Sequence, residues 1–201
     1  MSFFDDTKNA GLLLWIGGII MIIAGILSII GPFVMDYAKD WEMLHKAGYA
    51  VIGVGALVAA IVYFKLGKDI KGGSYSKFQV ISSFIAAVAY ASLVSGIIGG
   101  IGYFIATEWA NGAVEIIVGI LIFLILTWAN KKINDGQESL GDKIIWIILV
   151  VIFLIGFIGG VVGGISILGS AIIAAIASII EGILYLLLLV YVINVRDQFG
   201  I

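Results

Sequence analysis

The sequence predicts an all-α integral membrane protein with six transmembrane helices. Of its 201 residues, 62% are hydrophobic and only 12% are charged, about half the charged fraction of a soluble domain. The charges are confined to short segments, and the uncharged runs between them are long enough for helices that cross a bilayer core of about 30 Å. A mean hydropathy of +1.21 agrees, and the 27 glycines suit membrane helices that approach one another closely.

The composition excludes several classes of site. The chain has no cysteine, so it cannot form disulfides or thiolate metal sites. His45 is the only histidine, which excludes metal sites built from several imidazoles. The net charge of −2 gives no indication of a nucleic-acid partner. Because the sequence also lacks a nucleophile–base pair and a phosphate-binding loop, we expect neither enzymatic activity nor a cofactor.

The predicted spans follow the uncharged runs in order. The first four are residues 10–35, 47–64, 78–107 and 112–130. The last third has no charge from Ile144 to Ile180, which is 37 residues, and then continues past Glu181 to Val195. A helix of that length would be roughly 55 Å long at about 1.5 Å per residue, so the run must turn back. We place the turn in the glycine-rich segment 163–170, which gives the fifth and sixth spans.

A short interfacial helix is expected between the first two spans. Pro32 should stop or kink the first helix near its outer end. In residues 33–46, apolar residues then recur at intervals of three or four among charged ones. This pattern predicts a short amphipathic helix in the headgroup region. His45 is interpreted as an ordinary polar position of this helix or, alternatively, as a pH sensor.

The distribution of Lys and Arg predicts the orientation. With six spans, nine of the eleven basic residues fall on the side that holds both termini, which places both termini in the cytoplasm and the protein in the cytoplasmic membrane. Four of them lie in the connection 65–77, which is either part of this signal or a site for anionic lipid headgroups. A five-span alternative would place the C-terminus outside, against the charge of Arg196.

An internal repeat of about 64 residues divides the chain. Gly55, Gly119 and Gly182 are separated by 64 and 63 residues, and each is followed nine positions later by an aromatic residue. The prediction is a single transmembrane domain, residues 1–201, built from three sequential helical hairpins. The three repeats cover residues 10–70, 78–134 and 143–197.

The triplicated hairpin also resembles a known family. Gly18-Ile19-Ile20, Gly25-Ile26-Leu27 and Pro32 at the end of the first helix look like the HdeD-type short-repeat membrane proteins. This resemblance implies a six-helix protein of about this size, and some members are associated with acid resistance. It implies no catalytic residues.

Small residues recur every four positions on the third, fifth and sixth spans, the last through Ala174, Ser178 and Gly182, which predicts faces where helices pack closely. The two stripes named as packing faces consist of Ala87, Ala91, Ser95 and Gly99 on the third span, and Gly156, Gly160 and Gly164 on the fifth. Such faces are seams within the chain or, alternatively, the interface of a homo-oligomer or a larger membrane complex.

Glu181 is the one acid expected deep in the bilayer. It lies 15 residues before Arg196, about 22 Å along a helix, where an ionised carboxylate is costly. Tyr185 lies one turn further on the same face and Tyr90 lies mid-span in the third helix, so either hydroxyl could bond the carboxyl group. Glu115, nearer the end of its span, could pair with Glu181 across the bundle. The group is interpreted as a hydrogen-bonded acid that fixes packing or as a proton or cation relay.

These observations predict a small polytopic protein, solvated by membrane lipid and without its own catalytic centre, that acts as an accessory or assembly subunit or an oligomeric scaffold. The alternative is a proton- or cation-coupled small transporter or channel that uses Glu181. The surroundings of Glu181 separate the two. A water-accessible cavity favours the transporter, whereas a dry contact with a tyrosine favours the scaffold.

Overall fold

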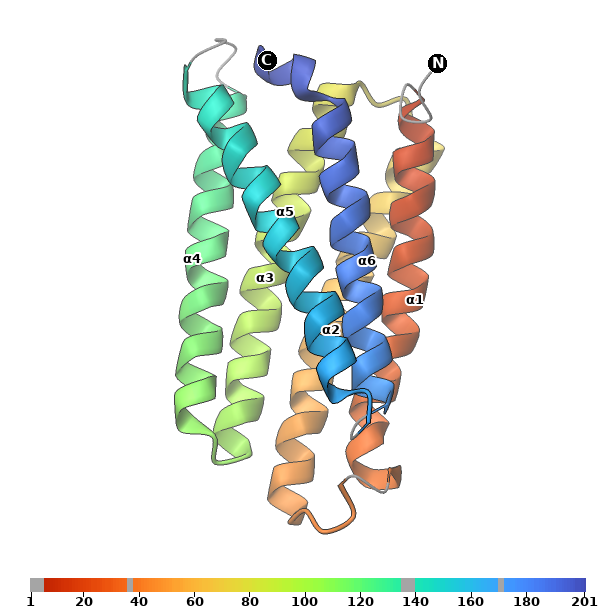
Figure 1. Cartoon of the computed structure of the whole chain (residues 1–201), viewed down its shortest axis with the longest axis vertical. Helices are drawn as coiled ribbons and strands as arrows, with labels where there is room; N and C mark the ends of the chain where they lie inside the picture. Colours follow the sequence, from red (N-terminus) through yellow and green to blue (C-terminus); the bar gives the residue numbers. More distant parts are fainter. Residues whose placement is uncertain (1–5, 36–37, 135–139, 170–171) are drawn as a thin grey trace.

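The protein is a bundle of long helices. A computed structural model describes residues 6–35, 38–134, 140–169 and 172–201, and these ranges contain no strand (Figure 1). The helices are α1 Thr7–Val34, α2 Met43–Gly72, α3 Lys77–Ile105, α4 Trp109–Ile133, α5 Leu140–Ile167 and α6 Ile172–Asn194, followed by the short 3-10 helix η3 Arg196–Phe199. In the described part of the chain, five helices are long and apolar enough to cross a membrane, and α6 contributes the shorter apolar stretch Ser178–Asn194.

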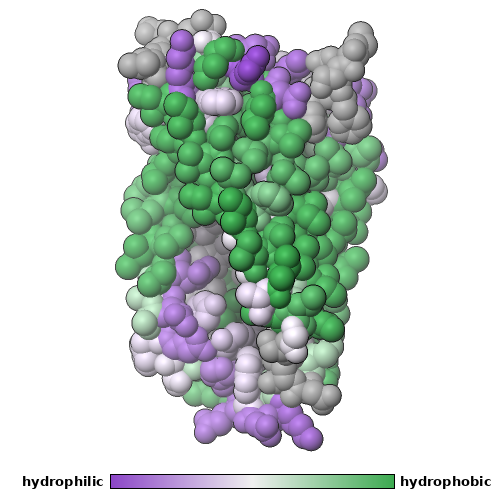
Figure 2. Space-filling model, viewed as in Figure 1, coloured by the Kyte–Doolittle hydropathy of each residue, from purple (hydrophilic) through white to green (hydrophobic). Residues whose placement is uncertain are grey.

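The surface of the bundle is that of a protein solvated by lipid. A hydrophobic band covers its middle, hydrophilic residues gather at both ends, and one hydrophilic patch interrupts the band in the lower half of the view (Figure 2). On α4, Val114, Ile117, Leu121 and Leu124 are all exposed. A continuous apolar surface of this kind is unfavourable in water. These helices are therefore those of an integral membrane protein, as the sequence predicts.

Helices that follow one another in the chain pack against each other. The contacts are extensive between α1 and α2, α2 and α3, α3 and α4, and α5 and α6, whereas α4 and α5 touch only slightly and α1 also meets α6. Thr7 Oγ1 donates a hydrogen bond of 2.9 Å to the carbonyl of Tyr75, and the Tyr191 hydroxyl lies 3.5 Å from the carbonyl of Lys77. The start of α1, the α2–α3 connection and the end of α6 thus share one end of the bundle, here called the terminal end. The opposite end, which holds the α3–α4 connection, is called the distal end.

A continuous interfacial helix over residues 33–46 does not form, because residues 39–42 are not helical, although Ala38 has a 3-10 conformation. Helix α1 continues through Pro32 to Val34, and α2 already begins at Met43. Between them, Ala38 and Trp41 form tight turns whose amides donate to Met35 and Ala38, while residues 36–37 lie outside the described ranges. Pro32 lies in the last turn of α1. Proline has no backbone N–H, and its ring clashes with the carbonyl of the preceding turn, so it is found near the end of a helix more easily than in its middle.

Two expected connections are also shorter than the sequence suggested. Helix α2 extends eight residues beyond its predicted end, so Lys65, Lys68 and Lys71 lie on its last turns, with Lys71 Nζ 4.3 Å from the ring centroid of Trp15. Helix α3 then starts with a capping box formed by Ser76 and Gln79. Helix α5 runs through most of the predicted turn 163–170, to Ile167. The charged residues and glycines at the ends of the uncharged runs are therefore still part of the helices.

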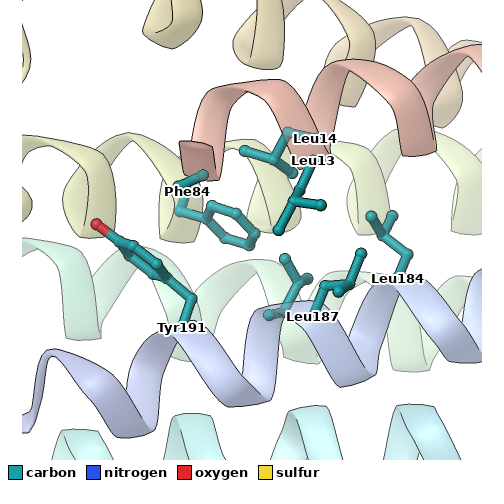
Figure 3. A pocket seen from close by; sticks show the side chains of 8 residues that line it. Leu13, Leu14, Phe84, Leu184, Leu187 and Tyr191 are labelled. Carbon is teal, nitrogen blue, oxygen red and sulfur yellow. The ribbon is translucent and has the colours of Figure 1, made fainter. Parts of the chain in front are cut away.

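An apolar layer fills the terminal half of the bundle. Leu14, Phe84, Phe153, Leu184 and Leu188 are all buried, and the rings of Phe84 and Phe153 meet edge to face with centroids 6.2 Å apart. The space left between α1, α3 and α6 is about 10 Å³ (Figure 3), no more than a single water needs. This layer closes the interior on the terminal side and leaves the distal half as the place for a polar site.

Candidate functional site

Glycines spaced by seven residues bring α1 and α2 into close contact. A Cβ atom on Gly18 would lie 2.5 Å from Cα of Phe64, and one on Gly25 would lie 2.9 Å from Cα of Leu57. Gly11 meets the backbone of α2 at Lys71 in the same way. Positions 11, 18 and 25 of α1 thus face positions 71, 64 and 57 of α2. Any side chain larger than hydrogen at the three α1 positions would clash with the α2 backbone. Sequence reasoning looked for intervals of four and missed it, although the interval of seven was visible.

The small-residue stripe of α5 packs against α6. A Cβ atom on Gly156 would lie 2.7 Å from the ring of Tyr185, and one on Gly160 would lie 2.6 Å from Cα of Gly182. One on Gly164 would lie 2.7 Å from the carbonyl of Ala175. Ser178 Oγ adds a hydrogen bond of 2.9 Å to the carbonyl of Gly160. This stripe is a seam within the chain, and it holds the segment of α6 that carries Glu181 and Tyr185.

The stripe of α3 leads from the apolar core into a cavity. Ala87 and Ala91 are buried. Further along, the carbonyl of Ser95 would lie 3.1 Å from a Cβ atom on Gly55 of α2. Gly99 faces α4, because its Cβ position lies 3.4 Å from Cγ of Glu115. The absence of side chains at this point leaves room for a glutamate.

Residues of five helices (α1, α2, α3, α4 and α6) line a partly open cavity of about 180 Å³ in the distal half of the bundle. Its polar lining comes from α2, α3, α4 and α6 and consists of Tyr63, Ser92, Ser95, Glu115, Glu181 and Tyr185. Its apolar walls are Met21 of α1, Ile52, Ala56 and Ala59 of α2, and Ala91 and Gly99 of α3. On the measure by which one water needs about 10–15 Å³, the cavity has room for several waters or a small molecule.

Glu115 and Glu181 reach this cavity from different helices. Glu115 lies six residues into α4 and Glu181 nine residues into α6, about 9 Å and 14 Å from the distal helix ends. Both carboxyl groups line the same cavity, so they repel each other when both are ionised. The residues that line the cavity include no Lys, Arg or His. Within the described ranges, neither carboxyl group has a hydrogen-bond or ion-pair partner.

Two tyrosines adjoin Glu181, and one of them was not anticipated. Tyr185 lines the cavity without the hydrogen bond to Glu181 that the sequence suggested, and its ring packs 6.2 Å from that of Phe153. Tyr63 also lines the cavity, and only 5% of its surface is exposed. The part of the chain that the structure describes offers the Tyr63 hydroxyl no hydrogen-bond partner.

Tyr90 does not belong to this site. Its side chain is 58% exposed on the outside of the bundle, where its ring packs 5.5 Å from that of Phe123. The neighbouring residue Ala91 faces the cavity, and successive residues of an α-helix point about 100° apart. The expected hydrogen bond from Tyr90 to Glu181 is therefore wrong.

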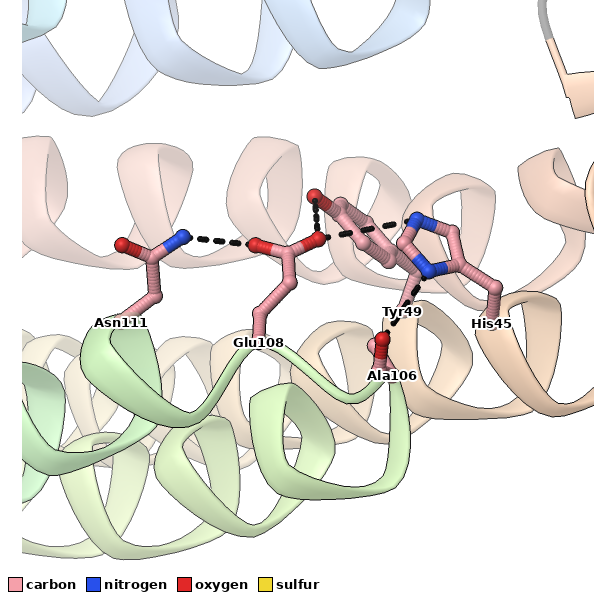
Figure 4. A network of polar contacts seen from close by, with 5 residues as sticks. All are labelled: His45, Tyr49, Ala106, Glu108 and Asn111. Atoms are coloured by element: carbon pink, nitrogen blue, oxygen red, sulfur yellow. Dashed lines mark hydrogen bonds and ion pairs between the residues drawn. The ribbon is translucent and has the colours of Figure 1, made fainter.

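A second polar cluster lies at the distal end, around Glu108 (Figure 4). The Tyr49 hydroxyl donates to Glu108 Oε1 at 2.9 Å, Asn111 Nδ2 donates to Oε2 at 2.6 Å, and His45 Nε2 lies 3.6 Å from Oε1. His45 Nδ1 donates to the carbonyl of Ala106 at 3.1 Å. These bonds join the start of α2 to the α3–α4 connection. Glu108 is a partnered, structural acid, in contrast to the two acids of the cavity.

Comparison of the chain with protein-family models, curated proteins and solved structures finds no match. In the described ranges, no group of three or more His, Cys, Asp or Glu side chains has the arrangement of a metal site. The function is therefore inferred from the chemistry of the cavity.

Proposed function

We propose that the protein is a small membrane transporter or channel that binds protons or cations at Glu115 and Glu181. One observation carries this proposal: two carboxyl groups from different helices line one cavity inside an apolar bundle. An acid at this depth is costly, and in membrane proteins it normally faces a partner or an aqueous path. A cation or a proton is the partner that both carboxyl groups lack within the described residues.

The exposure of Glu181 supports this function over a purely structural role. Although Glu181 lies well inside the bundle, its side chain is exposed to the cavity, as is Ala56 on the facing helix. Tyr185 lies beside it but forms no hydrogen bond with it in the described structure. Glu181 therefore lines a cavity and does not make a dry contact with a tyrosine, and this arrangement favours a transporter over a scaffold. The apolar layer on the terminal side supplies a barrier between the cavity and the other end of the bundle.

An accessory subunit or oligomeric scaffold is the second candidate, and it rests on the outer face of α5. A Cβ atom on Gly159 would meet nothing within 4 Å, and one on Gly163 would meet only Ser178 Oγ at 3.8 Å. Gly159 is exposed and Gly163 is partly buried, and two glycines four residues apart with open space at their Cβ positions suit close packing by another membrane helix. Either function has the protein in the cytoplasmic membrane, with both termini in the cytoplasm according to the placement of Lys and Arg.

Flux measurements in liposomes test the proposed function. The purified protein is reconstituted with a pH-sensitive dye inside the vesicles, and a proton, Na⁺ or K⁺ gradient is imposed. We expect protein-dependent flux that falls at least about tenfold in Glu181→Gln and Glu115→Gln. Glu108→Gln is the matched control, because it changes an acid outside the cavity, and it should retain the flux. Wild-type flux equal to that of empty vesicles would reject the transporter and leave the scaffold.

A further inference from the structure

We propose that the cavity binds a small organic cation, of the alkylammonium or guanidinium class, between Glu115 and Glu181 and against the ring of Tyr63. This inference rests on the proposed function and names its ligand class. It follows from four properties of the cavity: its size, its charge, its aromatic wall and its apolar wall.

The size of the cavity argues against a dehydrated inorganic ion. A bare Ca²⁺ ion, for example, needs six to eight oxygen ligands at about 2.3–2.6 Å. Besides the two carboxyl groups, the cavity of about 180 Å³ is lined by the hydroxyl-bearing side chains of Tyr63, Ser92, Ser95 and Tyr185, and the rest of its lining is apolar. A bare ion that touched one carboxyl group would fill only a small part of this space. A molecule with several heavy atoms fills the same space and spans the two acids.

The charge of the lining selects a cation with N–H groups. Glu115 and Glu181 line one cavity and repel each other when both are ionised, and the residues that line the cavity include no basic side chain. An ammonium or guanidinium group placed between them removes this repulsion and donates charge-assisted hydrogen bonds to both. Anions and neutral sugars offer the two carboxylates no comparable compensation.

Tyr63 is a second, independent indication of a ligand. It is only 5% exposed, it lines the cavity, and its hydroxyl has no partner in the described structure. The hydroxyl is not fully buried, so a ligand or an ordered water in the cavity can supply the hydrogen bond that the described residues do not. An aromatic ring in the lining can also contribute a cation–π contact to a bound cation.

The apolar part of the lining suits the carbon atoms of such a ligand. Met21, Ile52, Ala56 and Ala59 contribute only apolar side chains, and contact with methyl or ethyl groups removes apolar surface from water. Met side chains adapt to irregular shapes, which suits a binding wall. An organic cation therefore complements both the acidic and the apolar residues of the lining, whereas a hydrated inorganic ion complements only the acidic ones.

Calorimetric titration of the purified protein tests this inference directly. Ethylammonium, guanidinium and tetramethylammonium chlorides are titrated at constant ionic strength, with NaCl and KCl as controls. We expect saturable binding of at least one organic cation, at least about tenfold weaker in Glu181→Gln. Tyr63→Phe should weaken binding about threefold to tenfold, and the matched control Tyr90→Phe should leave it unchanged. Absence of saturable binding, equal binding of Na⁺ or K⁺, or undiminished binding by Glu181→Gln would overturn the inference.

A measurement on the wild type keeps the test valid if a variant fails to fold. Dicyclohexylcarbodiimide modifies protonated carboxyl groups in apolar surroundings, and mass spectrometry locates the product. Labelling of Glu115 or Glu181 should fall when the organic cation is added and should not fall with NaCl. Unchanged labelling would count against the site. Proton or Na⁺ flux without organic-cation binding would reject the ligand class alone, whereas binding without any flux would reject transport alone.

Discussion

Glu108 and Glu181 are the same residue type in the same bundle, yet their surroundings differ completely. Glu108 accepts hydrogen bonds from Tyr49 and Asn111 and lies 3.6 Å from His45. Glu181 lines a cavity without such a partner in the described ranges. A carboxylate whose oxygens are occupied by neighbouring donors fixes local structure. A carboxylate that faces a cavity without such donors can instead bind a ligand.

The largest effect is expected when the seam that holds Glu181 in place is filled. In Gly160→Leu, a Cβ atom would lie 2.6 Å from Cα of Gly182, so α5 and α6 must separate. Overpacking of this kind costs about 1–3 kcal/mol or more, and thermal unfolding in detergent should show a clearly lower midpoint. Gly159→Leu is the matched control, since its Cβ position is open. A large loss of stability in Gly159→Leu would instead identify the outer face of α5 as an oligomer seam.

The next effect separates the two acids by stability. Glu108→Ala leaves the Tyr49 and Asn111 donors without their acceptor, which should lower the free energy of unfolding by about 1–3 kcal/mol. Glu181→Gln should unfold at or above the wild-type temperature, because it removes a charge that no described partner compensates. Thermal unfolding of both variants in the same detergent measures the difference. A strong destabilisation by Glu181→Gln would show that this acid, too, is structural.

The sequence predicted the two cavity acids but not the tyrosine beside them, and the reason is physical. A charge within an apolar run is conspicuous, so Glu181 and Glu115 could be identified directly. Tyr63 stood next to the predicted end of its span, where an interfacial aromatic residue is ordinary. Helix α2 continues to Gly72, about 14 Å further along its axis, which moves Tyr63 into the bundle. An error in one helix end therefore concealed a site residue.

Helix lengths and helix rotation differ in how far sequence determines them. Long uncharged runs identified the spans, because transfer of apolar side chains to lipid decides whether a helix crosses. Lysines on the last turns of α2 did not end that helix, since long basic side chains reach the headgroups from a helix that continues. Which face of α3 meets the cavity depends on packing against α2 and α4. The sequence alone therefore could not tell that Ala91 faces inward and Tyr90 outward.

A variant of the cavity wall tests function without altering either acid. Ala56→Phe places a ring in the cavity opposite Glu181, so flux and organic-cation binding should both fall about tenfold, equivalent to about 1.4 kcal/mol. Stability should change little, because Ala56 is exposed to the cavity. Flux and titration assays on the same preparation measure the effect. Unchanged flux would mean that the cavity is not on the conduction path.

The smallest expected effect comes from removing one donor of Glu108. Tyr49→Phe deletes the hydroxyl that lies 2.9 Å from Glu108 Oε1 but keeps the ring that packs 4.8 Å from Trp41. Because Asn111 still donates to the other oxygen, the cost should be about 1 kcal/mol, the net value of one hydrogen bond. Flux should stay at the wild-type level, since the cluster lies outside the cavity. Tyr90→Phe, whose hydroxyl lies on the outer surface, is the control and should change neither stability nor flux. If Tyr49→Phe reduced flux as strongly as Glu181→Gln, the distal cluster would have to be part of the ion path. The hydrogen-bond partners of an acid would then no longer distinguish a structural acid such as Glu108 from a functional one such as Glu181.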